Sequence, residues 1–225
     1  PFYGLQGLSH LCYRYLKHLF DCPDSPPNRA QSRVKLLYYI PKLLYSSRFE
    51  SPVVVLALLL LTRLRERSEA TRASGHRLFT TALMVSSSYL CDNTYRASSW
   101  RDMSGGLFGI KTLNIMVREM LEWLEWDVSV DSVALERFGQ AISVDFARDR
   151  PVYPTYPAEM IWTRFSDSGN QHRLVASGIA PTSDANSGTG DPVASFESLD
   201  VLDTMLPISN RLRAQLYAFS SPSQY

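Results

Sequence analysis

Nine consecutive residues of this chain, 53–61, read VVVLALLLL, with no polar side chain among them. Ser51 and Pro52 come directly before them, as a helix cap and a proline at the first helical position. A helix that is apolar on every side must be covered by other elements, because it has no face that suits water. The run is also too short to span a membrane, which needs about 20 residues. It therefore predicts the central helix of a folded domain, and we expect no membrane span.

Apolar residues on both sides of this run recur at three- and four-residue spacings, which is the pattern of amphipathic helices. The pattern predicts helices over residues 5–20, 32–46, 78–90, 113–124 and 131–146, and a loop that contains Tyr95 and Trp100. The first of these helices carries its leucines on one face, so we expect that face to pack on the other helices. No segment before residue 150 alternates as a strand does. The expected fold class is all-α.

The character of the chain changes near residue 150. Three prolines follow within seven residues, and residues 166–195 are rich in Ser, Gly, Asp and Pro. Such a composition buries too little apolar surface to offset its ordering entropy, so we expect a mobile, largely irregular tail. Short helices are candidates over 199–205 and 208–219. We therefore divide the chain into an N-terminal amphipathic helix with its linker (1–31), a helical domain (32–150) and a Pro/Ser/Gly-rich tail (151–225).

The charge balance and the cysteines indicate which partners and which cellular compartment suit the protein. The 23 Lys and Arg residues nearly balance the 22 Asp and Glu residues, so no global field favours nucleic acid or a membrane surface. Three irregularly spaced cysteines, Cys12, Cys22 and Cys91, form no disulfide framework, which is typical of a reducing compartment. We expect an intracellular location, in the nucleus, the cytoplasm or both. The chain begins at Pro1 without an initiator methionine, which indicates a piece of a longer protein.

No constellation of residues supports catalysis. The string GGLFGIK at 105–111 lacks the spacing of a phosphate-binding loop and follows no strand, so we interpret it as a turn between helices. His10, Cys12, His18 and Cys22 do not share one helix face, as a closed zinc site would require. The carboxylates around Trp123 and Trp126 fit a solvated helix face better than a sugar cleft. We expect no enzyme activity, no metal, no cofactor and no small-molecule substrate.

Two stretches carry a more specific pattern than helical spacing. They are residues 36–64, LLYYIPKLLYSSRFESPVVVLALLLLTRL, and residues 82–130, ALMVSSSYLCDNTYRASSWRDMSGGLFGIKTLNIMVREMLEWLEWDVSV. They resemble the cyclin box of fungal cyclins of the phosphate-regulon type, whose pattern runs KYLxD, a loop with Tyr and Trp, a glycine step and ELNxMExxFLxxLDWxLxV. The matching residues are Tyr89, Leu90, Asp92, Tyr95, Trp100, Gly105 or Gly106, Leu113, Asn114, Met116, Leu121, Leu124, Trp126 and Val130.

This resemblance implies a fold and a partner. It identifies residues 32–150 as a divergent cyclin box, a five-helix bundle preceded here by an extra N-terminal helix. Members of the family bind a cyclin-dependent protein kinase, position its αC helix and have no catalytic residues of their own. Carried onto this sequence, the resemblance places the kinase-docking surface at Val85, Ser88, Tyr89, Val117, Leu121, Trp126 and Val128. Trp126 is the expected central anchor, since aromatic residues dominate the binding energy of interface centres.

Two charges of the family pattern are missing from this surface. Ser88 stands where KYLxD has its lysine, and Val117 stands where MExxFL has its glutamate. Losing both removes orienting contacts without leaving one buried charge unpaired. Two alternatives therefore stay open beside a kinase regulator. One is a cyclin-fold scaffold that does not activate a kinase, and the other is a nucleic-acid-binding module that would use Arg63, Arg65, Arg67 and Arg72.

Overall fold

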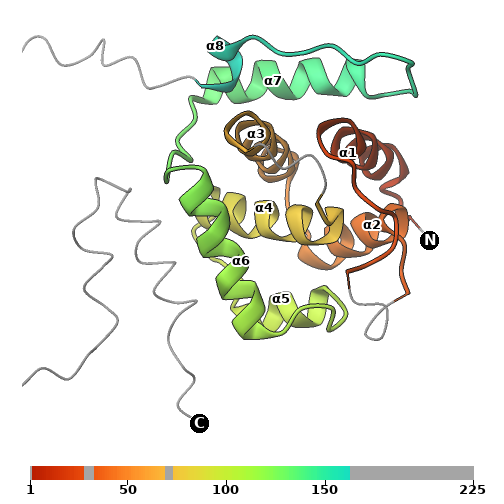
Figure 1. Ribbon diagram of the computed structural model, residues 1–225, viewed down its shortest axis with the longest axis vertical. Helices are drawn as coiled ribbons and strands as arrows, with labels where there is room; N and C mark the ends of the chain where they lie inside the picture. The colour runs from red at the N-terminus through yellow and green to blue at the C-terminus, as the bar shows by residue number, and fades with distance from the viewer. Residues whose placement is uncertain (1, 28–32, 69–72, 163–225) are drawn as a thin grey trace, which may run out of the picture.

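The computed structural model describes residues 2–27, 33–68 and 73–162, and within them it contains helices and no strand (Figure 1). The helices are α1 (Gln6–Leu19), α2 (Leu36–Ser47), α3 (Ser51–Arg67), α4 (Gly75–Leu90), α5 (Ala97–Met103), α6 (Ile110–Trp123), α7 (Ser132–Asp145) and α8 (Ala158–Ile161). The all-α prediction is confirmed. The expected mobile stretch 166–195 and the candidate helices over 199–205 and 208–219 lie outside the described residues.

Helix α3 is the centre of the bundle, as the apolar run predicts. It packs against α1, α4, α6, α7 and α8. Its side chains at Val54, Leu56, Ala57, Leu58 and Leu60 are all buried. Figure 1 looks nearly along α1 and α3, which lie side by side between α7 on one side and α2 with α4 on the other. Because other helices surround α3, only Val55 of the apolar run 53–61 is partly exposed.

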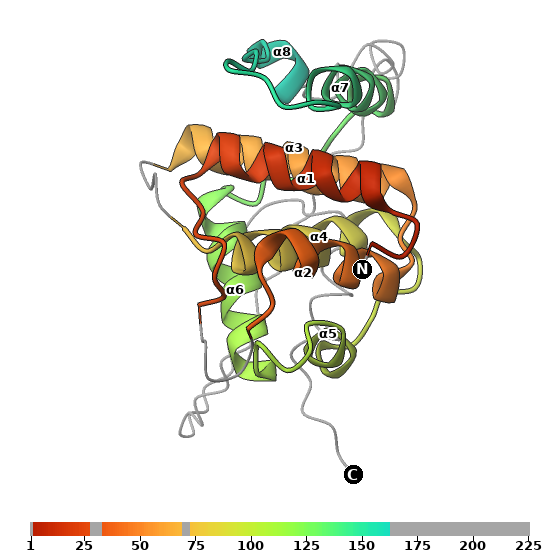
Figure 2. The same cartoon turned by 90° about the vertical axis from the view of Figure 1, so that its right-hand side faces the viewer.

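Helix α1 packs on the bundle through the face that its leucines predict. Leu11 and Leu16 are buried, and α1 contacts both α2 and α3 (Figure 2). Tyr15 on the same face is buried, and its hydroxyl lies 2.6 Å from Thr62 Oγ1 of α3. The Thr62 hydroxyl donates to the carbonyl of Leu58 at 2.9 Å, so Tyr15 is the donor to Thr62. The buried hydroxyl group is therefore satisfied, and α1 is an integral layer of the fold.

The segment between α4 and α6 contains a helix where the spacing predicts a loop. Helix α5 is seven residues long, and Trp100 on it is fully buried. The indole ring centroid lies 5.8 Å from the ring of Phe49 and 6.2 Å from that of Tyr95. Ala97, Trp100 and Met103 recur every three positions, but a helix of seven residues is too short to be stable alone, so the packing of Trp100 stabilises α5.

Residues 151–162 return to the bundle and cover α7 and α3 (Figure 1). The ring of Tyr153 stacks on that of Phe146, with centroids 4.3 Å apart and planes at 4°. Tyr156 packs edge-on against Phe138 of α7 and donates to the Asp145 carboxylate at 3.1 Å. Ile161 of α8 is buried. We call residues 151–162 the strap.

No helix among the described residues is long and apolar enough to cross a membrane.

Candidate functional site

The expected docking residues lie on two helices that pack together and on the turn that follows. Helices α4 and α6 are in contact, and Arg77 at the start of α4 pairs with Glu119 of α6. Ser74 caps α4 by accepting from the Arg77 amide at 3.5 Å. The seven residues divide into α4 (Val85, Ser88, Tyr89), α6 (Val117, Leu121) and residues 124–130 (Trp126, Val128). Residues 124–130 are called the docking turn below.

Most of these seven side chains are buried in the chain itself. The buried ones are Val85, Ser88, Val117, Leu121 and Val128. Tyr89 and Trp126 are half-buried and pack against the core. A partner can therefore reach Tyr89 and Trp126 directly, while the other five residues set the shape beneath them.

The two positions that lack the family's charges offer no polar grip on a partner. Ser88 is 1% exposed and Val117 is 6% exposed. The nearby carboxylate of Glu119 does not replace the missing glutamate, because it is engaged by Arg77. Neither position therefore adds a charge to the surface built by the ends of α4 and α6.

The docking turn has an unusual backbone. Glu125 and Trp126 have positive φ values of 52° and 61°, a left-handed conformation that residues with a side chain rarely adopt. Each such residue costs roughly 1–2 kcal/mol, so the surroundings must hold the turn in place. The Trp126 amide donates to the Leu121 carbonyl of α6 at 2.8 Å, and within the turn the Val128 amide donates to the Trp126 carbonyl at 3.0 Å.

Arg63 of α3 is the main external support of this turn. It is 1% exposed and donates from Nη1 to the carbonyls of Asp127 at 3.1 Å and Ser129 at 2.9 Å. Its Nε donates to the carbonyl of Ile161 in the strap at 2.7 Å. Burial lowers the pKa of Arg63, but a guanidinium starts so high that it stays charged at neutral pH. The site thus contains a buried cation that backbone carbonyls solvate.

A second arginine one turn further along α3 supports the same segment. Arg67 donates to the Leu124 carbonyl, and its Nη2 lies 3.6 Å from Glu125 and 3.7 Å from Asp127 carboxylate oxygens. The Trp162 ring lies over both guanidinium groups, 4.3 Å from Arg67 and 5.2 Å from Arg63, and its indole N–H donates to Glu66.

Sequence reasoning missed the role of these arginines. From the sequence we considered the cluster as a nucleic-acid-binding surface, and the burial of Arg63 contradicts that interpretation for this residue. One local signal was available, since Arg63 lies three and four residues after Leu60 and Leu59, which places it on a covered side of α3. Its acceptors lie at least 64 positions away in sequence and carry no local pattern.

The remaining candidate residues do not assemble into a reactive centre. The described residues contain no group of three or more metal-ligating side chains close enough to hold an ion. Cys12 and Cys22 are buried, and burial raises the pKa of both thiols, that of Cys22 to about 11. Thiols with a raised pKa remain protonated, which makes them poor nucleophiles and poor metal ligands.

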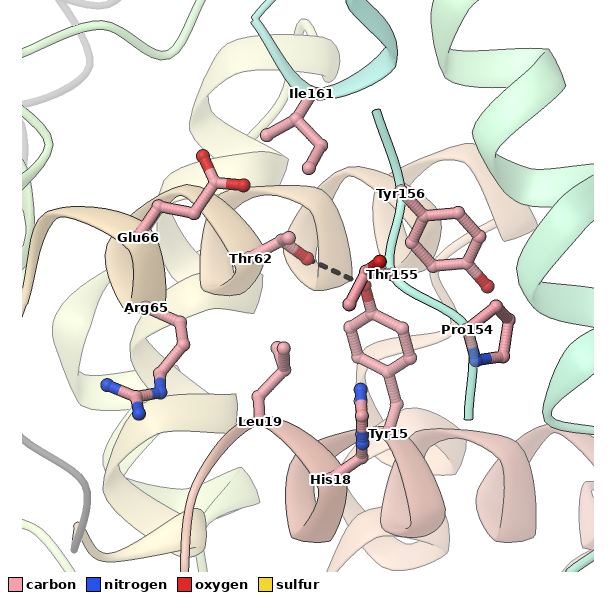
Figure 3. A pocket seen from close by; sticks show the side chains of 10 residues that line it. All are labelled: Tyr15, His18, Leu19, Thr62, Arg65, Glu66, Pro154, Thr155, Tyr156 and Ile161. Carbon is pink, nitrogen blue, oxygen red and sulfur yellow. Dashed lines mark hydrogen bonds between the residues drawn. The ribbon is translucent and has the colours of Figure 1, made fainter. Parts of the chain in front are cut away.

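A small cavity of about 250 Å³ opens between α1, α3 and the strap (Figure 3). The Tyr15 side chain extends from α1 toward Thr62 of α3, and a hydrogen bond joins their hydroxyl groups. His18 lines the cavity from α1, and Arg65 and Glu66 line it from α3. The cavity shares no lining residue with the seven docking positions, so it is separate from the docking surface.

Comparisons with known proteins point to one family. Residues 10–129 of this 225-residue chain match the family model "Cyclin, N-terminal domain". Saccharomyces cerevisiae PHO85 cyclin-1 is 27% identical over 136 residues, which cover 56% of this chain and 48% of that protein. PHO85 cyclin-2 of the same yeast is 27% identical over 101 residues, covering 43% and 33%. PHO85 cyclin-9 is 25% identical over 99 residues, covering 42% and 33%.

The chain thus spans about half or less of the length of these curated relatives. No solved structure matches it significantly.

Proposed function

Because this chain belongs to the cyclin family, we propose that it is a regulatory subunit that binds a cyclin-dependent protein kinase and positions the αC helix of that kinase. The observation that carries the proposal is the match over residues 10–129, which spans α1 to α6 and the docking turn up to Ser129. The resemblance to phosphate-regulon-type cyclins that the sequence indicates is confirmed by the yeast PHO85 cyclins. Their names make PHO85 the first partner to test.

The proposed docking surface is centred on Tyr89 and Trp126. A kinase of this class is inactive while its αC helix is displaced, because the Lys–Glu ion pair of its active site is then unmade. A rigid helical partner that packs on αC restores the pair by position alone. Five buried residues support this surface from below: Val85, Ser88, Val117, Leu121 and Val128. The partner supplies all catalytic groups, so we assign none to this chain and propose that it is not itself an enzyme.

Arg63 weakens the nucleic-acid alternative. A phosphate-binding surface needs accessible cations. Arg63 is enclosed and Arg67 is occupied by the docking turn, while Arg65 donates to the Ser68 carbonyl at 3.1 Å. The scaffold alternative uses the same docking surface, in which Ser88 and Val117 replace the orienting charges. It differs from the leading proposal only in whether the bound kinase becomes active.

Mixing the purified chain with PHO85 tests the proposal. We expect a stable complex by size-exclusion chromatography and phosphorylation of a peptide substrate that neither protein alone supports. A complex without activity favours the scaffold. Failure to bind PHO85 or any kinase recovered from cell extract, together with retention on DNA that salt abolishes, contradicts the proposal.

A further inference from the structure

Arg63 is a buried cation with an unusual set of partners. The nearest carboxylate oxygen, on Asp127, lies 3.9 Å from its Nη1, beyond ordinary hydrogen-bond distance. Its direct acceptors are the carbonyls of Asp127, Ser129 and Ile161, at 2.7–3.1 Å. Backbone carbonyls cannot move independently of the chain, unlike a carboxylate on a flexible side chain. A shift of the backbone therefore leaves the buried Arg63 charge without its acceptors.

These acceptors belong to two segments that are far apart in sequence. Asp127 and Ser129 are in the docking turn, whereas Ile161 is in the strap. The guanidinium is planar and rigid, so the direction of Nε fixes the direction of Nη1. Displacement of the strap removes the acceptor of Nε and leaves the guanidinium fixed only by the docking turn that it supports. The strap and the docking turn are thereby linked through one side chain.

Trp162 strengthens this link at the end of the strap. Its ring lies over Arg67 at 4.3 Å and over Arg63 at 5.2 Å, distances at which a cation is attracted to an indole face. Arg67 in turn holds the Leu124 carbonyl, where the docking turn begins. A single aromatic side chain therefore restrains both arginines that support the left-handed residues Glu125 and Trp126.

We propose that Trp162 is a positioning residue that acts through Arg63 and Arg67 to hold the docking turn in the conformation that presents Trp126. The strap thus sets the geometry of a surface that it does not itself form. The consequence for kinase binding rests on the proposed function, whereas the effect on the docking turn does not.

Amide hydrogen exchange in the isolated chain tests the positioning role. Trp162→Ala should accelerate exchange of the Trp126 and Val128 amides at least about fivefold, as the loss of one cation–π contact allows. Trp162→Phe keeps an aromatic face over the arginines, although it loses the indole N–H and the second ring, so exchange should stay closer to wild type than in Trp162→Ala. Tyr153→Ala is the matched control, because Tyr153 is an aromatic residue of the same strap that packs on Phe146 instead.

The comparison excludes a merely structural effect. If the substitutions only loosen the strap, amide exchange in residues 124–130 accelerates equally in the Trp162→Ala and Tyr153→Ala proteins. If Trp162 positions the docking turn, exchange in these residues accelerates in Trp162→Ala and not in Tyr153→Ala. Exchange in the docking turn that is the same in wild type and Trp162→Ala overturns the inference, and so does an equal effect of Tyr153→Ala.

Binding to PHO85 then separates the inference from the function. Trp162→Ala should weaken the complex about fivefold, Trp162→Phe should restore it, and Trp162→Ala should have no further effect in a Trp126→Ala background, since both act on one contact. Full additivity of the two substitutions overturns the link to Trp126. If Trp162→Ala changes amide exchange in the docking turn but the wild-type protein binds no kinase, the positioning role is supported and the proposed function is rejected.

Discussion

Trp126 combines a left-handed backbone, with φ at 61°, and a half-buried ring on the surface of the bundle. The conformation persists because Arg63 and Arg67 hold the carbonyls on both sides of it. The neighbouring tryptophan, Trp123, is the last residue of α6 and is 56% exposed. Two tryptophans three residues apart therefore have different surroundings, which offers a direct test of the docking surface.

Trp126→Ala should weaken kinase binding by about 2 kcal/mol or more, because central aromatic anchors carry most of the energy of an interface. Trp123→Ala removes a more exposed ring from the same helix region and should leave affinity nearly unchanged. Titration of PHO85 with each variant by calorimetry gives both values. Equal losses for the two variants, or none for either, place the docking surface elsewhere.

The missing charges at Ser88 and Val117 predict a complex that responds weakly to salt. Between 0.05 and 0.5 M NaCl we expect affinity for PHO85 to change by less than about threefold, since screening acts on charge pairs and little on apolar contact. Introducing both charges, Ser88→Lys with Val117→Glu, should strengthen the complex and increase its salt dependence. Either change alone should help less or harm, because the new charge lacks its partner.

Both positions are buried, so the stability of each variant must be measured beside its affinity. Thermal unfolding identifies a variant whose weaker binding reflects a damaged fold. A strongly salt-dependent wild-type complex contradicts the apolar surface.

At the scale of the elements, close approach of helices leaves little room at a few glycines. A Cβ atom at Gly75, the first residue of α4, lies 2.5 Å from Leu36 Cδ2 and 3.3 Å from Cys22 Cβ. Leu36 is itself fully buried and has no space to withdraw. By contrast, a Cβ atom at Gly7 of α1 meets no atom within 4 Å.

Gly75→Ala should therefore lower the free energy of unfolding by about 1–3 kcal/mol, the usual cost of overpacking a core. Gly7→Ala should be neutral or raise it by up to about 1 kcal/mol, because alanine favours a helix more than glycine does. Urea unfolding followed by circular dichroism measures both. If the two variants are equally stable, α4 does not begin as closely against α2 as the structure has it.

At the scale of the whole molecule, His76 connects α4 to the chain before α2. Its Nε2 lies 3.0 Å from the Val34 carbonyl and must donate to it, which leaves Nδ1 without a proton and without a hydrogen-bond partner. Its ring packs on that of Tyr39 at 4.8 Å. Burial lowers the pKa of His76, and the hydrogen bond to Val34 and the charge of Asp24 oppose this only in part.

A histidine with a lowered pKa binds its proton more readily in the unfolded chain. The contribution of His76 to stability is therefore complete above pH 6.5, the ordinary pKa, and decreases as the pH falls below it, by at most about 1.4 kcal/mol per pH unit. Burial also lowers the pKa of His18, which adds a loss of the same sign. Thermal unfolding at pH 7.5 and pH 5.5 should show lower stability at the acid value.

His76→Gln keeps an N–H donor near Val34 and cannot be protonated, so its stability should fall less between these two pH values than that of the wild type. Parallel losses in both proteins assign the acid sensitivity to other groups.

The sequence by itself determined the helical class, the central place of α3 and the family. Helical period depends on residues three and four positions apart, so Leu8, Leu11 and Tyr15 reveal the first helix without knowledge of the fold. The unbroken apolar run 53–61 shows instead that its segment must be covered on every side. The spacing of Tyr89, Trp126 and the residues between them was enough to indicate a cyclin box.

Only the tertiary structure decided which side of these residues faces water and what holds the docking turn. Tyr89 and Trp126 are half-buried while Val117 and Leu121 are covered, a distinction that depends on how α4 packs against α6. Arg63 is buried because carbonyls 64, 66 and 98 positions along the chain converge on it. Backbone carbonyls are the same in every residue, so no sequence pattern marks the ones that a fold gathers around a cation.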